Sequence, residues 1–421
     1  MRPENLRTSF WRYFFFMFGY GVFCLAAALL LAELAGMAAV GVYHGLFLTT
    51  SSVAKGLPPP RGGRAVFSLR SRLDDDMQSA SSAYDGRSWA EEFWRERRAS
   101  SVATSFRYEP FRVWGNASFH GKYLNADETN KGILRRTINR CEGRQKQRAD
   151  VWFFGGSTAF SAETPDFATI PSYLSQELNR QDRGCVEVAN MGVPGYVINQ
   201  EMIQLIGLLK AGHRPDAVVF YDGANDADVG AYSPAIAWAH GDFLEIKAKF
   251  ESAVDVAGIE ERSYAFRAAR GILRRLKRPV LVAAGSDGKA VAMSLSEEAL
   301  SRKAGAALDN YEANIRLIKS LGKEYGFRAY FFWQPVLAYG NRSKTPFEEI
   351  LNAHPLFASK DENRAVAAVY REAERRAALK RGFSFLGRAF DRIGEPIYVD
   401  SVHLGPQGNK IIAETMAPIV R

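Results

Sequence analysis

Four short polar segments of the sequence, each after an apolar run, contain side chains able to carry out acyl transfer. They are Gly155-Gly156-Ser157-Thr158, Asn190-Met191-Gly192, Gly223-Ala224-Asn225-Asp226 and Asp400-Ser401-Val402-His403. A serine is a strong nucleophile only when a base removes its proton, and a histidine titrates near neutral pH and can be that base. We expect one helical turn to place Asp400 beside His403, where the carboxylate holds the second ring nitrogen. These residue types indicate catalysis by Ser157, His403 and Asp400.

The elements that must position these segments alternate between strand and helix. Short apolar runs typical of buried parallel strands lie at 151–154, 186–189, 217–221, 329–333 and 383–386. Segments with helical spacing lie at 169–179, 199–210, 308–325, 362–381 and 406–419. The pattern predicts an α/β fold with a doubly wound parallel sheet, a flavodoxin-like three-layer sandwich. Ligands bind beyond the carboxyl ends of such strands, so the four segments should meet at one edge.

In this order, the four segments resemble the SGNH (GDSL-type) hydrolase family over residues 150–421. The resemblance implies a serine hydrolase of acyl esters, often esters of carbohydrates or envelope polymers. It also implies an oxyanion hole formed by the backbone N–H groups of Ser157 and Gly192 and the side-chain amide of Asn225. The sequence departs from the family pattern at Gly156, where the name-giving motif has Asp, and in an apparent insertion at 228–305.

Two further side chains are candidates for substrate binding. Gln334 directly follows the fourth strand and should line the pocket, whereas His354 either approaches the site or lies on the surface. Asp226 is interpreted as a structural turn or capping carboxylate. No group of His, Cys and carboxylate residues has metal-ligand spacing, so we expect no metal and no cofactor.

The N-terminal part of the chain predicts a membrane anchor. Residues 13–32 contain no charged side chain and are long enough to span a bilayer as a helix, and the apolar character continues to residue 48. Arginines precede this stretch, so residues 1–12 should be cytoplasmic and the rest extracytoplasmic, or periplasmic in a Gram-negative bacterium. A cleaved signal peptide is the alternative. Residues 49–149 are interpreted as a linker and membrane-proximal neck, or as short strands that wrap against the main domain.

The composition limits the classes of function. The chain has 421 residues, of which 47% are hydrophobic, and a formal net charge of +9. The basic excess lies almost entirely before residue 150, and no basic stripe with interleaved aromatic residues follows it, which argues against nucleic-acid binding. The expected partners are therefore an acylated small molecule or polysaccharide, and a lipid bilayer contacted by the N-terminal helix.

Two other features of the sequence lead to expectations outside the active site. Cys141 and Cys185 fall near the start of neighbouring strands, so they either form a disulfide or remain free thiols. Residues 260–278 predict a basic amphipathic helix that lies on the domain, contacts an anionic bilayer or covers the site.

The function that these features predict is a membrane-anchored serine ester hydrolase. An O-acyltransferase that uses the same residues is an alternative, because a sugar hydroxyl can replace water. A catalytically idle glycan-binding module is a second alternative. A phosphate-binding domain built on the turn at Ser157 is disfavoured, because the sequence has neither a Walker lysine nor a GxGxxG motif.

Overall fold

The computed structural model describes residues 78–100, 106–140, 148–180, 185–232, 240–241, 246, 296–353 and 360–420, and isolated positions between 17 and 31. The chain divides into two compact units. One contains residues 1–61 and 244–287, and the other contains the remainder. The fold described below is that of the second unit.

The centre of this unit is a mostly parallel sheet. Five parallel strands form it: β6 (Arg148–Gly155), β7 (Cys185–Asn190), β8 (Ala217–Asp222), β9 (Arg328–Trp333) and β10 (Ser384–Phe385). They lie in the order β10-β9-β8-β6-β7. This is the flavodoxin-like order 2-1-3-4-5, which confirms the predicted doubly wound sheet. Every residue of β8 is buried, as expected for a central strand covered on both faces.

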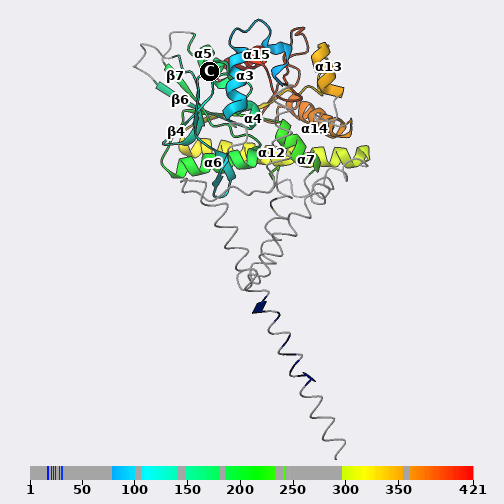
Figure 1. Ribbon diagram of the computed structural model, residues 1–421. Helices are drawn as coiled ribbons and strands as arrows, with labels where there is room; N and C mark the ends of the chain where they lie inside the picture. Colours follow the sequence, from blue (N-terminus) through cyan, green and yellow to red (C-terminus); the bar gives the residue numbers. More distant parts are fainter. Residues whose placement is uncertain are drawn as a thin grey trace, which may run out of the picture. The chain divides into compact units, whose positions relative to one another are not determined.

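Helices cover both faces of the sheet, and Figure 1 shows the two helical layers. One layer contains α6 (Ile198–Lys210), α7 (Ala224–Tyr232), α12 (Glu297–Tyr325) and α14 (Lys360–Ala378). The other contains α5 (Ile170–Leu178) and α15 (Pro406–Val420), with Leu351 of α13 (Pro346–Ala353) in the same apolar cluster. Two separate cores result, one between each layer and the sheet, as in a three-layer sandwich.

Helix α12 is longer than the sequence pattern predicts. It begins at Glu297, with Ser296 accepting a hydrogen bond from the Ala299 N–H as its N-cap. The added turns pack against α7, where a Cβ on Gly230 would lie 2.5 Å from the Ala307 Cβ. The two ends of the predicted insertion at 228–305 therefore belong to α7 and α12, which pack against each other in the core. The basic helix predicted at 260–278 lies outside the described residues.

The segment interpreted as a neck is built into the domain over its described part. Three strands, β3 (Phe119–His120), β4 (Asn125–Thr129) and β5 (Gly132–Arg135), extend the sheet, and β5 pairs antiparallel with β7. The preceding hairpin contains β1 (Phe106–Glu109) and β2 (Val113–Asn116). Residues 119–135 thus extend the central sheet, whereas β1 and β2 form a separate two-stranded sheet. Over these residues the structure agrees with the alternative interpretation, short strands that pack against the main domain.

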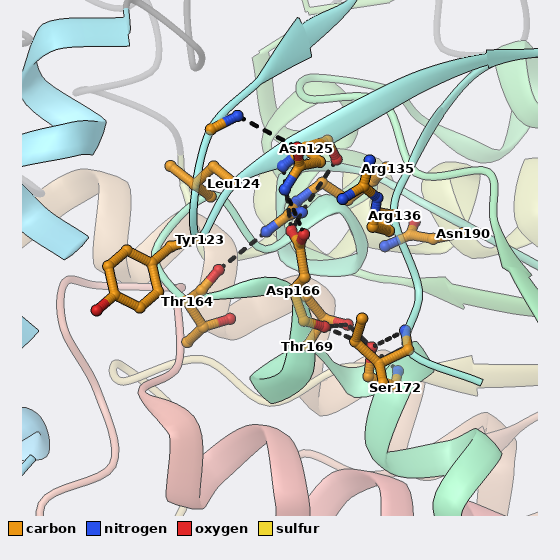
Figure 2. Close-up of polar contacts among 12 residues, drawn as sticks. Tyr123, Leu124, Asn125, Arg135, Arg136, Thr164, Asp166, Thr169, Ser172 and Asn190 are labelled. Atoms are coloured by element: carbon orange, nitrogen blue, oxygen red, sulfur yellow. Dashed lines mark hydrogen bonds and ion pairs between the residues drawn. The ribbon is translucent and has the colours of Figure 1, made fainter. Parts of the chain in front are cut away.

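A buried polar network attaches this added hairpin to the loop after Ser157 (Figure 2). The Arg135 guanidinium is fully buried and pairs with Asp166 in the 3₁₀ turn η3 (Asp166–Ala168). It also donates to the backbone oxygens of Thr164 and Asn125, at 3.0 and 3.1 Å. Asn125 donates to Asp166 through its side-chain amide, at 2.7 Å. The loop after the predicted nucleophile is thereby held to the β4–β5 hairpin.

The structure bears only in part on the predicted membrane helix and on the predicted disulfide. Isolated residues between 17 and 31 are helical and exposed, and no described helix is both long and apolar enough to cross a membrane. Cys185 is disulfide-bonded, whereas Cys24 is a free thiol. The predicted partner Cys141 lies outside the described residues.

Candidate active site

Ser157 lies where strand β6 turns into the short helix α4 (Ser157–Phe160). Gly155 adopts a φ of 154°, and a Cβ there would lie 2.7 Å from the Tyr221 carbonyl oxygen, so no other residue fits at this position. As the first residue of the helix, Ser157 has a backbone N–H without an intrahelical acceptor. The turn therefore places a partly exposed serine, with an N–H that lacks an intrahelical acceptor, directly after strand β6.

Asp400 and His403 are joined directly, but not by a helical turn. The His403 Nδ1 lies 2.6 Å from Asp400 Oδ2, and Asp400 Oδ1 accepts from the backbone N–H groups of Val402 and His403, at 2.8 and 2.6 Å. The chain here is a turn that the bridge between Tyr398 and Leu404 closes. The predicted pairing is confirmed and the predicted helix is wrong, because the carboxylate itself binds the backbone of the turn.

The charges of this pair shift both pKa values. Burial alone raises the pKa of Asp400, but the charge of His403 and the hydrogen bonds to Asp400 outweigh it and hold that pKa below its usual value. For His403, burial lowers the pKa, whereas the negative charges of Asp400 and Glu163 and the Asp400 hydrogen bond raise it to about 9. The imidazolium form of His403 is therefore stabilised, as in a catalytic dyad.

His403 Nε2 points away from Asp400, is buried and has no hydrogen-bond partner among the described residues. Ser157 therefore does not donate to it in this structure. A short chain of contacts nevertheless links the two loops at one edge of the sheet. The Thr158 hydroxyl donates to Gln334 Oε1 at 2.8 Å, and the Leu337 N–H donates to the Ser401 carbonyl oxygen at 2.9 Å. Both Thr158 and Ser401 adjoin a proposed catalytic residue in the sequence.

Asn225 is positioned as a donor next to the serine turn. Its Nδ2 donates to the Tyr196 carbonyl oxygen at 2.8 Å, and the second hydrogen of the same amide remains to bind an oxyanion. A Cβ added to Gly156 would lie 2.3 Å from this Nδ2. The glycine that departs from the family pattern is therefore what lets the amide of Asn225 approach the turn.

Gly192 lies at the same edge of the sheet, but its N–H has another partner. It donates to Asn190 Oδ1 at 2.9 Å. A Cβ on Gly192 would lie 2.6 Å from the Phe160 nitrogen, which explains the need for glycine by close packing. Of the three expected oxyanion donors, the Gly192 N–H is therefore engaged within the protein, and the Asn225 amide has one hydrogen engaged by the Tyr196 carbonyl oxygen.

Gln334 is buried at the end of β9 and borders the site through Thr158. Its Nε2 has no partner among the described residues. His354, the other predicted substrate contact, lies outside the described residues. Within the described part of the chain, no group of three His, Cys, Asp or Glu side chains is placed to hold a metal ion.

Sequence reasoning missed a cluster of interacting carboxyl groups, Glu201, Asp222 and Asp226, near the start of α7. Burial raises the pKa of Glu201 and Asp222, each buried, and that of Asp226 to about 7. The Tyr311 hydroxyl donates to Asp222 at 3.1 Å. Asp226 accepts from the Ile198 N–H at the start of α6, as its interpretation as a capping carboxylate predicts. No local pattern signals this cluster, since its members come from separate elements.

No protein-family model matches the sequence, and no curated protein is similar to it. Solved structures that align with the chain include an acetylxylan esterase from Geobacillus stearothermophilus, at 14% identity and a TM-score of 0.31, over 65% of this chain and 94% of that one. A protein assigned to the G-D-S-L lipolytic family from Desulfitobacterium hafniense aligns at 11% identity and 0.32, over 64% and 99%. An alpha/beta hydrolase from the metagenome of Lake Arreo aligns at 13% and 0.31, over 65% and 94%. These values are too low to assign a function, so the assignment depends on the geometry of the site.

Proposed function

We propose that this protein is a serine ester hydrolase that uses Ser157, His403 and Asp400. One observation carries the proposal. The Asp400–His403 pair is hydrogen-bonded, and its free Nε2 is buried with no partner among the described residues. Contacts of Gln334 with Thr158 and of Leu337 with Ser401 connect this pair to the turn at Ser157. A buried histidine with a purely structural role would have both ring nitrogens hydrogen-bonded. A general base instead keeps one ring nitrogen free to accept the proton of the nucleophile.

The reaction begins when Ser157 attacks the ester carbonyl and His403 Nε2 takes the hydroxyl proton. Asp400 holds Nδ1 and stabilises the imidazolium that forms. The Ser157 N–H and the free amide hydrogen of Asn225 donate to the oxyanion of the tetrahedral intermediate. His403 then protonates the leaving alcohol, and a water molecule activated by the same imidazole hydrolyses the acyl-enzyme.

The substrate class that we propose is an acyl ester of a carbohydrate or envelope polymer. The support is the resemblance of the four segments to the SGNH family and the partial exposure of Ser157. An O-acyltransferase uses the same first half-reaction, and a sugar hydroxyl then replaces water. Product analysis with and without an alcohol acceptor separates the two, since the hydrolase releases free acid and the transferase forms a new ester.

We propose in addition that the N-terminal segment anchors the chain in a membrane, with residues 1–12 cytoplasmic and the catalytic domain extracytoplasmic. The uncharged stretch at 13–32 and the preceding arginines support this topology, and the disulfide at Cys185 is consistent with an oxidising compartment. Protease digestion of intact spheroplasts should remove the domain, whereas protection of the domain contradicts this topology.

The catalytic assignment is tested by p-nitrophenyl acetate turnover and by labelling with a fluorophosphonate probe, both on the full chain in detergent. We expect wild type to turn over the ester and to be labelled, and Ser157→Ala to lose both activities. Ser320→Ala is the matched control, because its hydroxyl donates to a backbone carbonyl on the exposed face of α12. Absence of labelling at Ser157 in wild type would favour an idle glycan-binding module.

A further inference from the structure

Gln78 donates a hydrogen bond to the proposed catalytic carboxylate from a distant part of the chain. Its Nε2 lies 2.5 Å from Asp400 Oδ2, the oxygen that also binds His403, although 322 positions separate the two residues in the sequence. Gln78 is 5% exposed. The carboxylate accepts hydrogen bonds only, so the amide must face it with nitrogen, not oxygen. Asp400 therefore receives a donor from outside its own turn.

The N-terminal segment that carries Gln78, residues 78–100, is docked around the site. The Ser81 hydroxyl donates to the Tyr398 carbonyl oxygen at 3.1 Å, two residues before Asp400. The Tyr84 hydroxyl, in the 3₁₀ turn η1 (Ser82–Tyr84), donates to the Glu163 carbonyl oxygen at 2.7 Å. Both contacts are buried, and they hold the start of the segment against the turn of the proposed base and against the loop after α4, the helix that begins with Ser157.

Apolar packing supports the same docking. Helix α3 (Ala90–Ser100) buries Phe93 and Trp94 in a cluster with Phe160 of α4 and Val399, the neighbour of Asp400. Arg97 of α3 also donates to the Ala162 carbonyl oxygen at 2.8 Å. Large apolar side chains of this kind contribute most of the stability of such a contact, so the position of Gln78 is a consequence of a packed core.

We propose that Gln78 is a positioning residue for the Asp400–His403 pair, and that the active site is complete only when the segment 78–100 is docked. This inference rests on the proposed function. The amide restrains rotation of the carboxylate and so keeps Oδ2 in line with the imidazole. It also stabilises the negative charge of Asp400, which weakens the attraction between that charge and the imidazolium.

Several other charged groups act on the pair, and they remain unchanged when Gln78 is replaced. Glu163, in the loop after α4, raises the pKa of His403, and Arg97 of α3 lowers it. The buried Tyr84 hydroxyl stays neutral, since burial and the nearby carboxylates raise its pKa. A shift in His403 titration in a Gln78 variant therefore reports the amide itself.

The test replaces Gln78 by Met, which keeps the length of the side chain and removes the donor, in the full chain. In wild type, kcat/KM should rise with pH through the His403 pKa, near 9. In Gln78→Met we expect kcat to fall about tenfold to hundredfold with KM unchanged. The variant loses a hydrogen bond to a charged carboxylate, and such bonds are stronger than those between neutral groups. The rise in kcat/KM should move to higher pH by about one unit.

Gln204→Met is the matched control, because Gln204 is also a buried glutamine but lies on α6. It should leave kcat and the pH profile as in wild type. An unchanged pH profile and kcat in Gln78→Met overturn the inference. The same loss in both variants also overturns it, since that result indicates general damage to the fold.

A second readout keeps the inference separate from the proposed function. NMR titration of ¹⁵N-histidine-labelled protein measures the His403 pKa directly, with the signal assigned by its loss in His403→Ala. If wild type shows no Ser157-dependent turnover, the proposed function fails, and this titration still decides the role of Gln78. An upward shift in Gln78→Met supports positioning, and no shift overturns it.

Discussion

At the residue scale, the site depends on close approaches that only glycine permits. Gly155, two residues before Ser157, adopts a positive φ, and Gly156 leaves room for the Asn225 amide. A Cβ at position 156 would lie 2.3 Å from the Asn225 Nδ2. The absence of a side chain at position 156 is thus coupled to the position of the proposed oxyanion donor.

Gly156→Ala should therefore displace the Asn225 side chain. We expect kcat to fall by about 10- to 100-fold with little change in KM, since loss of an oxyanion donor costs up to about 10²–10³ in kcat. Gly207→Ala is the control, because no atom lies within 4 Å of a Cβ added at this position of α6. Steady-state kinetics of both variants check the prediction, and equal activity of the two would contradict it.

At the scale of elements, the buried ion pair between Arg135 and Asp166 joins the β4–β5 hairpin to the loop after α4. Arg135 and Asp166 expose 0% and 8% of their side chains, whereas the neighbouring pair Arg136–Asp127 exposes 41% and 32%. Removal of one partner from a buried pair leaves an uncompensated charge, which is far more costly than the same change at the surface.

Arg135→Met should lower the free energy of unfolding by about 3–5 kcal/mol, because Asp166 then stays buried without its cation. Arg136→Met should lower it by less than about 1 kcal/mol. Urea unfolding of the two variants beside wild type measures both values. Similar losses in the two variants would show that the buried pair has no special role in docking the hairpin.

At the scale of the whole molecule, segments that precede residue 150 complete the domain, whereas the proposed catalytic residues all follow residue 150 in the sequence. Strands β3–β5 extend the sheet, the segment 78–100 contacts Asp400, and Cys185 at the start of β7 is disulfide-bonded. A cross-link of this kind restricts the unfolded chain and so stabilises the folded one.

Thiol titration of the denatured, unreduced chain should detect Cys24 alone, and Cys141→Ser should add the thiol of Cys185. The same variant should lose about 2–4 kcal/mol of unfolding free energy, through the larger freedom of its unfolded state. Cys24→Ser is the control and should keep wild-type stability. A Cys141→Ser chain without a second reactive thiol would show that Cys185 has a different partner.

The sequence by itself determined the parallel sheet and the location of the proposed catalytic residues. Short apolar runs predicted strands β6–β10, and helical spacing predicted α5, α6, α14 and α15, within a few residues of their observed bounds. Parallel strands place their carboxyl ends at one edge, so the order of the elements was enough to predict that Ser157, Asn225 and His403 lie on the same side.

Only the tertiary structure decided which donor meets which acceptor. The Gln78–Asp400 contact and the Arg135–Asp166 pair have no local signal, since 322 and 31 positions separate their members in the sequence. The packing of α12 against α7, at Ala307 and Gly230, likewise joins distant parts of the chain. Periodicity reports which face of an element is buried, whereas these contacts depend on how distant elements pack, which no local pattern encodes.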